Sequence, residues 1–241
     1  MDSTILAKSL VACAVAVVGS TLHGTVGIGF GLFVAPILAL IDPLFVPGPI
    51  LLSGLVLVVL MAYRERQAID SSGMTLALVG RVVGVLAAIA VLAILPKREM
   101  TVFFGVLVLL AVLLSVSDLH IRPTTWAIIS IGMLSGLMST TSAIGGPPMA
   151  LLYQNSPGAR LRSTLSGYLI FGTIISLLSL AFIGRFSYDE LRLSFVLLPG
   201  VLIGFLFSTR ALVFLDQKHT RAAVLVISAV SGLVVILRAL L

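Results

Sequence analysis

The sequence contains very little charge. Only 10% of its 241 residues are Asp, Glu, Lys or Arg, whereas a soluble domain carries about a quarter. Hydrophobic residues make up 59% of the chain, and its mean hydropathy is +1.23. Apolar runs of roughly 20 residues, the length that crosses a bilayer core, recur along almost the whole chain. This composition predicts an all-α polytopic membrane protein and leaves no stretch long enough for a soluble domain.

The chain is also poor in residues that build disulfides and metal centres. Cys13 is its single cysteine, so no disulfide can form within the chain, and three histidines exclude a His-rich metal channel. We expect no metal and no cofactor. The first apolar run, with Lys8 before it and the small residues 14–16 within it, resembles a signal peptide. We nevertheless expect it to be a membrane segment, because it completes the repeat described below.

The formal net charge is +6, and the Lys and Arg residues are scattered through short loops. This distribution favours positive-inside anchoring and contact with lipid headgroups, and it gives no indication of nucleic-acid binding. It is also compatible with attraction of anionic substrates. The bias between the two sets of loops is small, so the sequence leaves the membrane orientation open, and it says nothing about the oligomeric state.

Carboxylates are missing from the middle of the apolar runs. All nine acidic residues lie at or near predicted segment ends, which disfavours a carrier that couples transport to protons or sodium through a buried carboxylate. Arg81 instead lies near the middle of segment 70–95, where an arginine is costly unless it faces a cavity or snorkels. His23 is the one titratable group expected beside the pathway. A neutral histidine that donates to a backbone carbonyl is an equal alternative.

Breaker residues and charges divide the chain into ten apolar segments. We place them at 4–22, 27–41, 47–63, 70–95, 99–117, 124–140, 145–155, 161–183, 190–215 and 219–241. The second and the seventh are too short to be comfortable independent spans. Each follows a longer segment through a turn rich in Gly, Ser and Thr. We therefore expect two broken or re-entrant helix pairs.

Three pairs of sequence blocks recur in the same order. The aligned pairs are 80–100 with 200–220, 25–31 with 141–147, and 51–57 with 164–170. Together they predict an internal duplication, with residues 1–118 and 119–241 as the two transmembrane repeats. If the short segments turn back, each repeat has five segments. An odd number inverts the second repeat, as in many secondary transporters whose site lies near the bilayer midplane between broken helices.

The two breaks carry the candidate site. Irregular backbone at membrane depth is tolerated only where it is buried in protein or lines a polar cavity. A helix that starts there directs free N–H groups and a positive dipole end into the gap, which suits an anion, and the hydroxyls beside the breaks, Ser139 among them, can add donors. The predicted substrate-binding residues are Thr21, His23, Thr25, Gly27, Gly29, Gly31, Arg81, Thr140, Thr141, Ser142, Gly145, Gly146 and Pro147.

Close helix crossing is the alternative role for glycine in a membrane helix. We prefer it for Gly80 and Gly84, and for Gly200 and Gly204, which are spaced four apart within long segments. Crossing alone does not explain two consecutive prolines and a hydroxyl cluster at the second break. For the two breaks we therefore prefer the substrate site.

At these residues the sequence resembles the TauE/SafE sulfite exporter family, within the four-toluenesulfonate uptake permease superfamily. The family's glycine-rich first motif, followed by a proline, resembles residues 27–31 with Pro36, and its Gly-Gly-Pro motif resembles residues 145–147. Its basic loop resembles Arg64 and Arg66 before residues 68–70. The resemblance implies transport, often export, of sulfite or organosulfonates. The family usually has a further glycine where Phe30 stands, so we expect a narrower or reshaped pocket in the first half.

We therefore predict a multi-pass transporter in a bacterial inner membrane, with a small sulfur-containing anion as its substrate and membrane lipid around it. The transport would be driven by the membrane potential through alternating access. A proton-coupled anion permease is the first alternative. An intramembrane enzyme, with Ser135 as nucleophile and His23 or His120 as base, is a distant one, so we expect no enzyme activity. A scaffold that transports nothing would not need two symmetric breaks at membrane depth.

Overall fold

The computed structural model describes residues 3–69, 71, 73–117, 119, 121–153, 157–214 and 217–241. Its helices are α1 (Ser3–Val26), α2 (Phe30–Ile41), α3 (Gly48–Arg64), α4 (Met74–Ile94), α5 (Lys97–Val116), α6 (Thr125–Ser142), α7 (Gly146–Tyr153), α8 (Gly158–Phe182), α9 (Tyr188–Phe214) and α10 (Gln217–Leu240). Two short 3₁₀ helices, η1 (Pro43–Phe45) and η2 (Arg66–Ala68), follow α2 and α3. The segments predicted from the sequence match α1 to α10 to within a few residues, and the part of the chain described here contains no strand.

Six of these helices are long and apolar enough to cross a membrane: α1, α4, α5, α8, α9 and α10. Large apolar side chains such as Leu86, Leu178 and Leu206 are exposed on them. Exposed leucines of this kind are costly in water and ordinary in lipid, whose hydrocarbon tails are as apolar as the side chains themselves. The protein is an all-α, multi-pass membrane protein.

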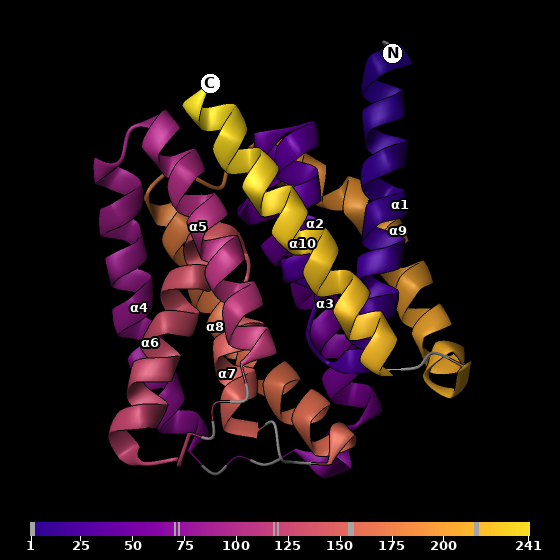
Figure 1. Ribbon diagram of the computed structural model, residues 1–241, viewed down its shortest axis with the longest axis vertical. Helices are drawn as coiled ribbons and strands as arrows, with labels where there is room; N and C mark the ends of the chain where they lie inside the picture. Colours follow the sequence, from indigo (N-terminus) through magenta and orange to yellow (C-terminus); the bar gives the residue numbers. More distant parts are fainter. Residues whose placement is uncertain are drawn as a thin grey trace.

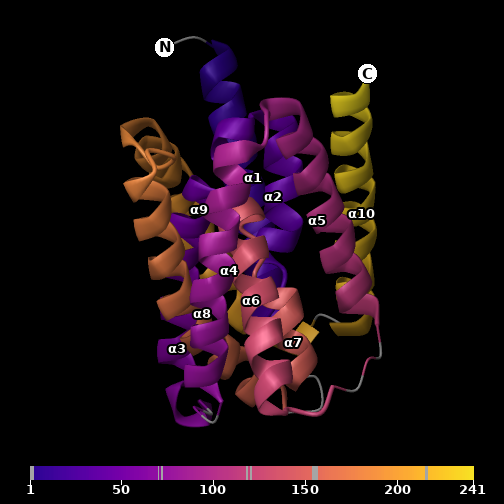
Figure 2. The ribbon, with the colours of Figure 1, turned by 90° about the vertical axis from the view of Figure 1, so that its left-hand side faces the viewer.

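The first helices of the two predicted repeats run in opposite directions. In Figure 1, α1 starts at the top of the molecule and α6 starts at the bottom. The packing of helices is also reciprocal: α4 packs on α6 and α9 on α1, while α3 packs on α8 and α5 on α10. Figure 2 shows both chain termini at the same end of the bundle. An inverted duplication would produce this arrangement, although the homology of the two repeats stays a prediction.

Glycines allow the closest of these helix crossings. A Cβ atom at Gly80 or Gly84 of α4 would lie about 2 Å from a carbonyl oxygen of α6, at 2.0 and 1.9 Å. Gly200 and Gly204 of α9 lie equally close to the backbone of α1, where a Cβ atom would be 2.3 Å from the nearest carbonyl oxygen. The packing interpretation of these four glycines therefore holds, because no larger residue fits between the helix backbones.

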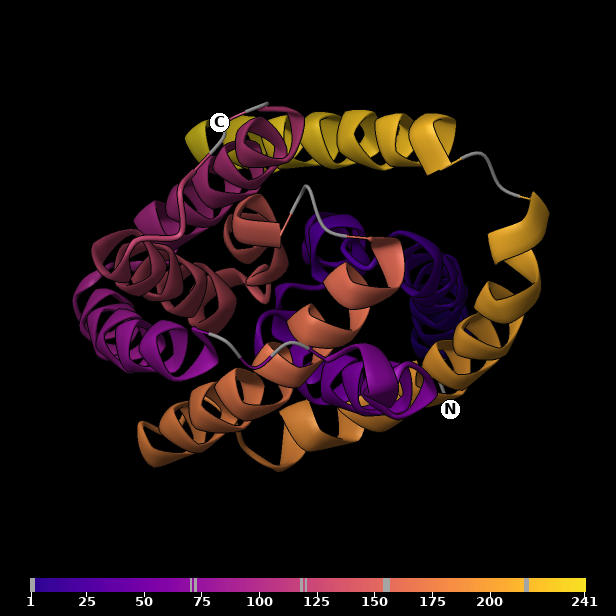
Figure 3. The ribbon, with the colours of Figure 1, turned by 90° about the horizontal axis from the view of Figure 1, so that it is seen from below.

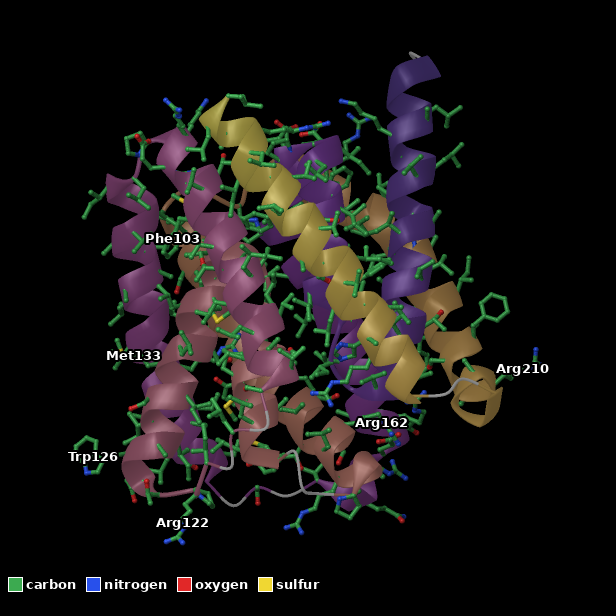
Figure 4. The ribbon with its side chains drawn as sticks, in the orientation of Figure 1. Phe103, Arg122, Trp126, Met133, Arg162 and Arg210 are labelled. Carbon is green, nitrogen blue, oxygen red and sulfur yellow. The ribbon has the colours of Figure 1, made fainter. Side chains whose placement is uncertain are left out.

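The two short helices lie inside the bundle. Seen from below in Figure 3, α2 and α7 occupy the interior, and the longer helices surround them. We call the end that lies at the bottom of Figure 1 the lower face; the ends of α3 and α7 and the starts of α4, α6 and α8 lie there. Figure 4 shows Arg122, Trp126 and Arg162 toward this end, with Arg210 pointing away from the bundle. Arg210 therefore does not reach the interior.

Candidate anion site

Both helix breaks line a single cavity of about 50 Å³. Its walls come from the end of α1, the start of α2, the middle of α3, the α6–α7 break and the middle of α8. Most of the wall is apolar, and the polar side chains in it are His23, Ser139 and Thr173. A buried water needs about 10–15 Å³ of such space. The cavity can therefore hold a few waters or one small ion.

His23 caps the start of α2 from the first break. The break passes through Gly27 and Gly29, both with positive φ, and Gly29 provides no side chain to cap the helix. Instead, the backbone N–H of Phe30 donates to Nδ1 of His23 at 3.3 Å. Because Nδ1 accepts this bond, the imidazole is neutral and its proton is on Nε2. Nε2 is buried without a partner among the described residues, and His23 lines the cavity, so this N–H can donate to a bound anion.

The second break ends α6 in a left-handed turn. Ala143, with φ of 61°, caps α6 and donates its backbone N–H to the carbonyl oxygen of Ser139 at 2.8 Å. Helix α7 then starts at Gly146, and its next two residues are prolines, which have no N–H. The free donors at its start are therefore the N–H groups of Gly145 and Gly146.

The two breaks touch each other through their backbones. A Cβ atom at Gly31 would lie 2.0 Å from the carbonyl oxygen of Ala143, so only glycine allows this contact. Gly146 faces the side chain of Ile28, and a Cβ atom there would lie at an ordinary 3.5 Å. The positive ends of α2 and α7 consequently converge on the same small space.

Arg81 lies directly behind the cavity wall. It is fully buried among α4, α6 and α8, and its guanidinium donates to Oγ of Ser135 at 3.3 Å and to Oγ of Ser139 at 2.8 Å. It also lies 5.0 Å from the ring centroid of Tyr168. None of the ion pairs formed by the described residues includes Arg81. A buried charge without a counterion is unfavourable, so an anion in the adjoining cavity would be attracted to Arg81.

A family model described as "Sulfite exporter TauE/SafE" matches residues 11–235. The chain belongs to the TauE/SafE sulfite exporter family. This is a family of membrane transporters and not of enzymes, and the resemblance seen in the sequence is confirmed over nearly the whole chain. No curated protein and no solved structure matches the chain.

Nearly half of the site residues predicted for this TauE/SafE chain line the cavity. They are His23, Gly29, Gly31, Gly145, Gly146 and Pro147. Arg81 reaches the cavity only through Ser139, which lines it. Gly27 faces the other way, against the side chain of Arg162. The structure therefore groups the backbone of both breaks but not all the side chains beside them.

None of the threonines and serines in the predicted substrate-binding set lines the cavity, although the neighbouring Ser139 does. The hydroxyls of Thr25, Thr141 and Ser142 donate to backbone carbonyls three or four residues earlier in their own helices. Thr21 donates to Val17 in its own helix and to Gly204 of α9, and Thr140 bonds Ser176 of α8. Back-bonding of this kind is the usual fate of Ser and Thr within a helix, where few other acceptors are near. Hydroxyls beside a break are consequently not substrate ligands by position alone.

Two parts of the cavity wall were not predicted from the sequence. Thr173 on α8 lines the cavity, but it lies in an ordinary apolar run, and no motif around it indicates a binding residue. Gly54 on α3 faces the ring of Phe30, to which a Cβ atom at Gly54 would lie at 3.2 Å. The residue that departs from the family pattern therefore packs against a glycine on the neighbouring helix, and the cavity remains beside it.

The serine-protease alternative has no support in the geometry. Ser135 donates to the carbonyl oxygen of Gly145 at 2.6 Å and accepts from Arg81, while Nδ1 of His23 accepts from Phe30. His120 lies outside the described residues. Among the described residues, these contacts give Ser135 and His23 separate partners, and the family is one of transporters.

Proposed function

We propose that this transporter exports a small sulfur-containing oxyanion, such as sulfite or an organosulfonate, across the inner membrane of a bacterium. The observation that carries the proposal is Arg81, fully buried without a carboxylate partner among the described residues and bonded to a serine in the cavity wall. Family membership supports transport of a small anion. The cavity adds donors of the kind an oxyanion needs, from His23, Ser139 and the helix starts.

The anion would bind between the two breaks and be released by alternating access. Helices α2 and α7 present their N-terminal ends to the same cavity, so a rocking motion of the bundle around them would expose that cavity to one face and then the other. A membrane potential that is negative inside favours outward movement of an anion by about 2.3 kcal/mol per charge per 100 mV. Export would thus need no coupling ion.

The two ends of the bundle differ in their acidic residues and not in their number of described basic residues. At the lower face, the described basic residues of the connections and adjoining helix ends are Arg64, Arg66, Arg122, Arg160, Arg162 and Arg221, and Glu65 is the described acidic residue near them. The opposite end has as many described basic residues, Lys8, Lys97, Arg98, Arg185, Arg192 and Arg238, but these are mixed with Asp42, Glu99, Asp189 and Glu190. Among the described residues the lower face is therefore the more positively charged end, which favours the approach of an anion from that side.

Proton-coupled anion transport is the second candidate, because His23 lies in the cavity wall. The described carboxylates lie at helix ends, as in Asp42 after α2 and Glu190 in the first turn of α9. A proton relay through these helices would therefore have to use His23. Uniport needs no such relay, and we prefer it for that reason.

A transport screen with a blocked cavity tests the proposal. Proteoliposomes would be offered sulfite, sulfate, thiosulfate, sulfoacetate and taurine, with wild type, Gly146→Leu and Gly146→Ala compared for each. The Leu side chain would fill the space beside Ile28, whereas the Ala methyl group fits at 3.5 Å. We expect transport of at least one sulfur anion by wild type and Gly146→Ala, and none by a monodisperse Gly146→Leu. Transport by the folded Leu variant would refute the site, and no flux of any of the anions through wild type would refute the function.

A further inference from the structure

Two arginines and one glutamate form a partly buried cluster at the lower face. Arg162, in the first turns of α8, contacts Glu65 at the end of α3 through Nη2 to Oε1 at 2.8 Å and Nε to Oε1 at 2.9 Å. Arg64 approaches the same Oε1 atom with Nη2 at 3.5 Å. The three side chains are only 11–16% exposed. Among the ion pairs of the described residues, Glu65–Arg162 is the one that joins the two predicted repeats.

The cluster carries more positive than negative charge. One carboxylate faces two guanidinium groups, and Nε of Arg64 is buried without a partner among the described residues. The rest of the Arg64 guanidinium donates to Oγ of Ser208 at 2.9 Å and to the carbonyl oxygen of Gly24 at 2.7 Å. Two partly buried arginines around one carboxylate are the geometry that binds oxyanions in proteins.

The cluster separates the cavity from the lower face. Arg64 bonds the carbonyl of Gly24, next to His23 in the cavity wall, and a Cβ atom at Gly27 would lie 2.4 Å from Cγ of Arg162. On the outer side, Tyr63 to Ala68 and Ala159 line a surface hollow of about 550 Å³. Above the breaks, by contrast, a cavity of about 130 Å³ extends from Pro43 and Arg185 to Thr141. The ion pairs thus lie between the hollow and the first break.

We propose that Arg64 and Arg162 form a second anion subsite, which Glu65 occupies in this conformation and so closes the pathway. When the lower side opens, the Glu65–Arg162 pair separates, and the passing oxyanion takes the place of the carboxylate between the two arginines. The exchange leaves one anion between the two arginines, because the oxyanion replaces the carboxylate. The excess positive charge of the cluster attracts the incoming oxyanion. This inference rests on the proposed function as an anion transporter, and it adds the step by which the anion reaches the cavity.

Thiol labelling of the cavity tests the subsite without any transported anion. In a Cys13→Ala background, which removes the only native cysteine, Thr173→Cys places a thiol in the cavity wall. Membrane vesicles of each orientation would be treated with impermeant methanethiosulfonates, one anionic (2-sulfonatoethyl) and one cationic (2-trimethylammonioethyl). A separate Gln67→Cys variant, exposed at the lower face, identifies the vesicles in which that face is accessible. Arg66→Gln is the matched control, since Arg66 is next to Glu65 in the chain but its guanidinium lies over the ring of Tyr63, near the end of α3.

We expect Glu65→Gln to speed labelling of the cavity thiol from the lower face by about tenfold, the effect of removing about 1.4 kcal/mol of closing energy. Arg66→Gln should label at the wild-type rate. The anionic reagent should gain several-fold more than the cationic one in Glu65→Gln, and adding Arg162→Gln should remove this preference while labelling stays fast. Unchanged labelling in a folded Glu65→Gln variant would overturn the closure, and an equal gain for both reagents would overturn the anion subsite. Neither labelling result depends on which anion is transported. Failure of the subsite can therefore be distinguished from failure of the proposed function.

Discussion

Arg81 provides the charge that makes the cavity suitable for an anion. Its guanidinium is fully buried and donates to the hydroxyl of Ser139, a residue of the cavity wall. A serine that accepts a hydrogen bond from a cation becomes a better donor through its own O–H, because hydrogen bonds in a chain polarise one another. We therefore expect Arg81 to act on a bound anion both by its field and through Ser139.

Replacing Arg81 by glutamine should weaken anion binding by about 1–3 kcal/mol, the usual scale for a charge-assisted contact. Lysine should be intermediate, because it keeps the charge but cannot bond Ser135 and Ser139 with one planar group. Binding would be measured by calorimetry on purified protein, with thermal unfolding as the check on folding. Arg210→Gln is the control, since Arg210 points away from the bundle in Figure 4. Equal affinities in wild type and both folded Arg81 variants would make Arg81 a purely structural residue.

Residue types predicted the backbone of the site better than its side chains. Gly29, Gly31, Gly145 and Gly146 could be found because closely spaced glycines at membrane depth mark places where a helix can break, and all four line the cavity. The direction of the hydroxyl groups could not be predicted. A rotation about χ1 is enough to turn a Ser or Thr hydroxyl from the backbone of its own helix toward the cavity. The cap that His23 makes on α2 joins residues seven apart across a break. In an unbroken helix the two would share a face but lie about 10 Å apart, so helical spacing alone does not indicate this contact.

At the scale of elements, α2 and α7 are held together by their starts. The contact between Gly31 and the carbonyl of Ala143 joins one break to the other, and it leaves no room for a Cβ atom. Gly146, three residues after Ala143, has room for a Cβ atom, which would meet Ile28 at 3.5 Å. The two positions are both glycines that line the cavity, but they differ in how close the opposing backbone comes.

Alanine at these two glycines should therefore have opposite outcomes. Gly31→Ala should lower the free energy of unfolding by about 1–3 kcal/mol, the usual cost of overpacking a close contact, and should impair transport by separating the breaks. Gly146→Ala should leave both properties near wild type, because its methyl group meets Ile28 at 3.5 Å. Denaturation in detergent and anion flux in proteoliposomes measure the two effects. Equal stability of the two variants would show that the breaks do not depend on this backbone contact.

The sequence predicted the helices well because the membrane imposes their length and composition. The expected and observed segment ends differ by up to four residues, as at the first break, where α1 continues to Val26, and at the start of α4, which begins at Met74. Around the first break only the glycines indicated where a helix could end, because the apolar residues there are compatible with a continuous helix. The cluster of Glu65 and Arg162 was not predicted, because the two residues are 97 positions apart and meet only through the packing of α3 on α8.

At the scale of the whole molecule, charge movement is the property that distinguishes uniport from coupled transport. The described carboxylates stand at helix ends, and His23 is the titratable side chain in the cavity wall. With Nδ1 bonded to Phe30, His23 serves as a neutral donor. Glutamine offers both an acceptor and a donor, so His23→Gln should keep the cap and the contact while removing the capacity to carry a proton.

Anion flux under an imposed potential, with pH equal on both sides, tests potential-driven anion transport most directly. Potassium gradients with valinomycin would set the potential across proteoliposomes that contain wild type or His23→Gln. Flux should follow the sign and size of the potential in both proteins, since each 100 mV contributes about 2.3 kcal/mol per charge and twice that for a dianion. Flux that requires a pH gradient, ignores the potential and fails in a folded His23→Gln variant would contradict uniport and make His23 the proton-coupling residue.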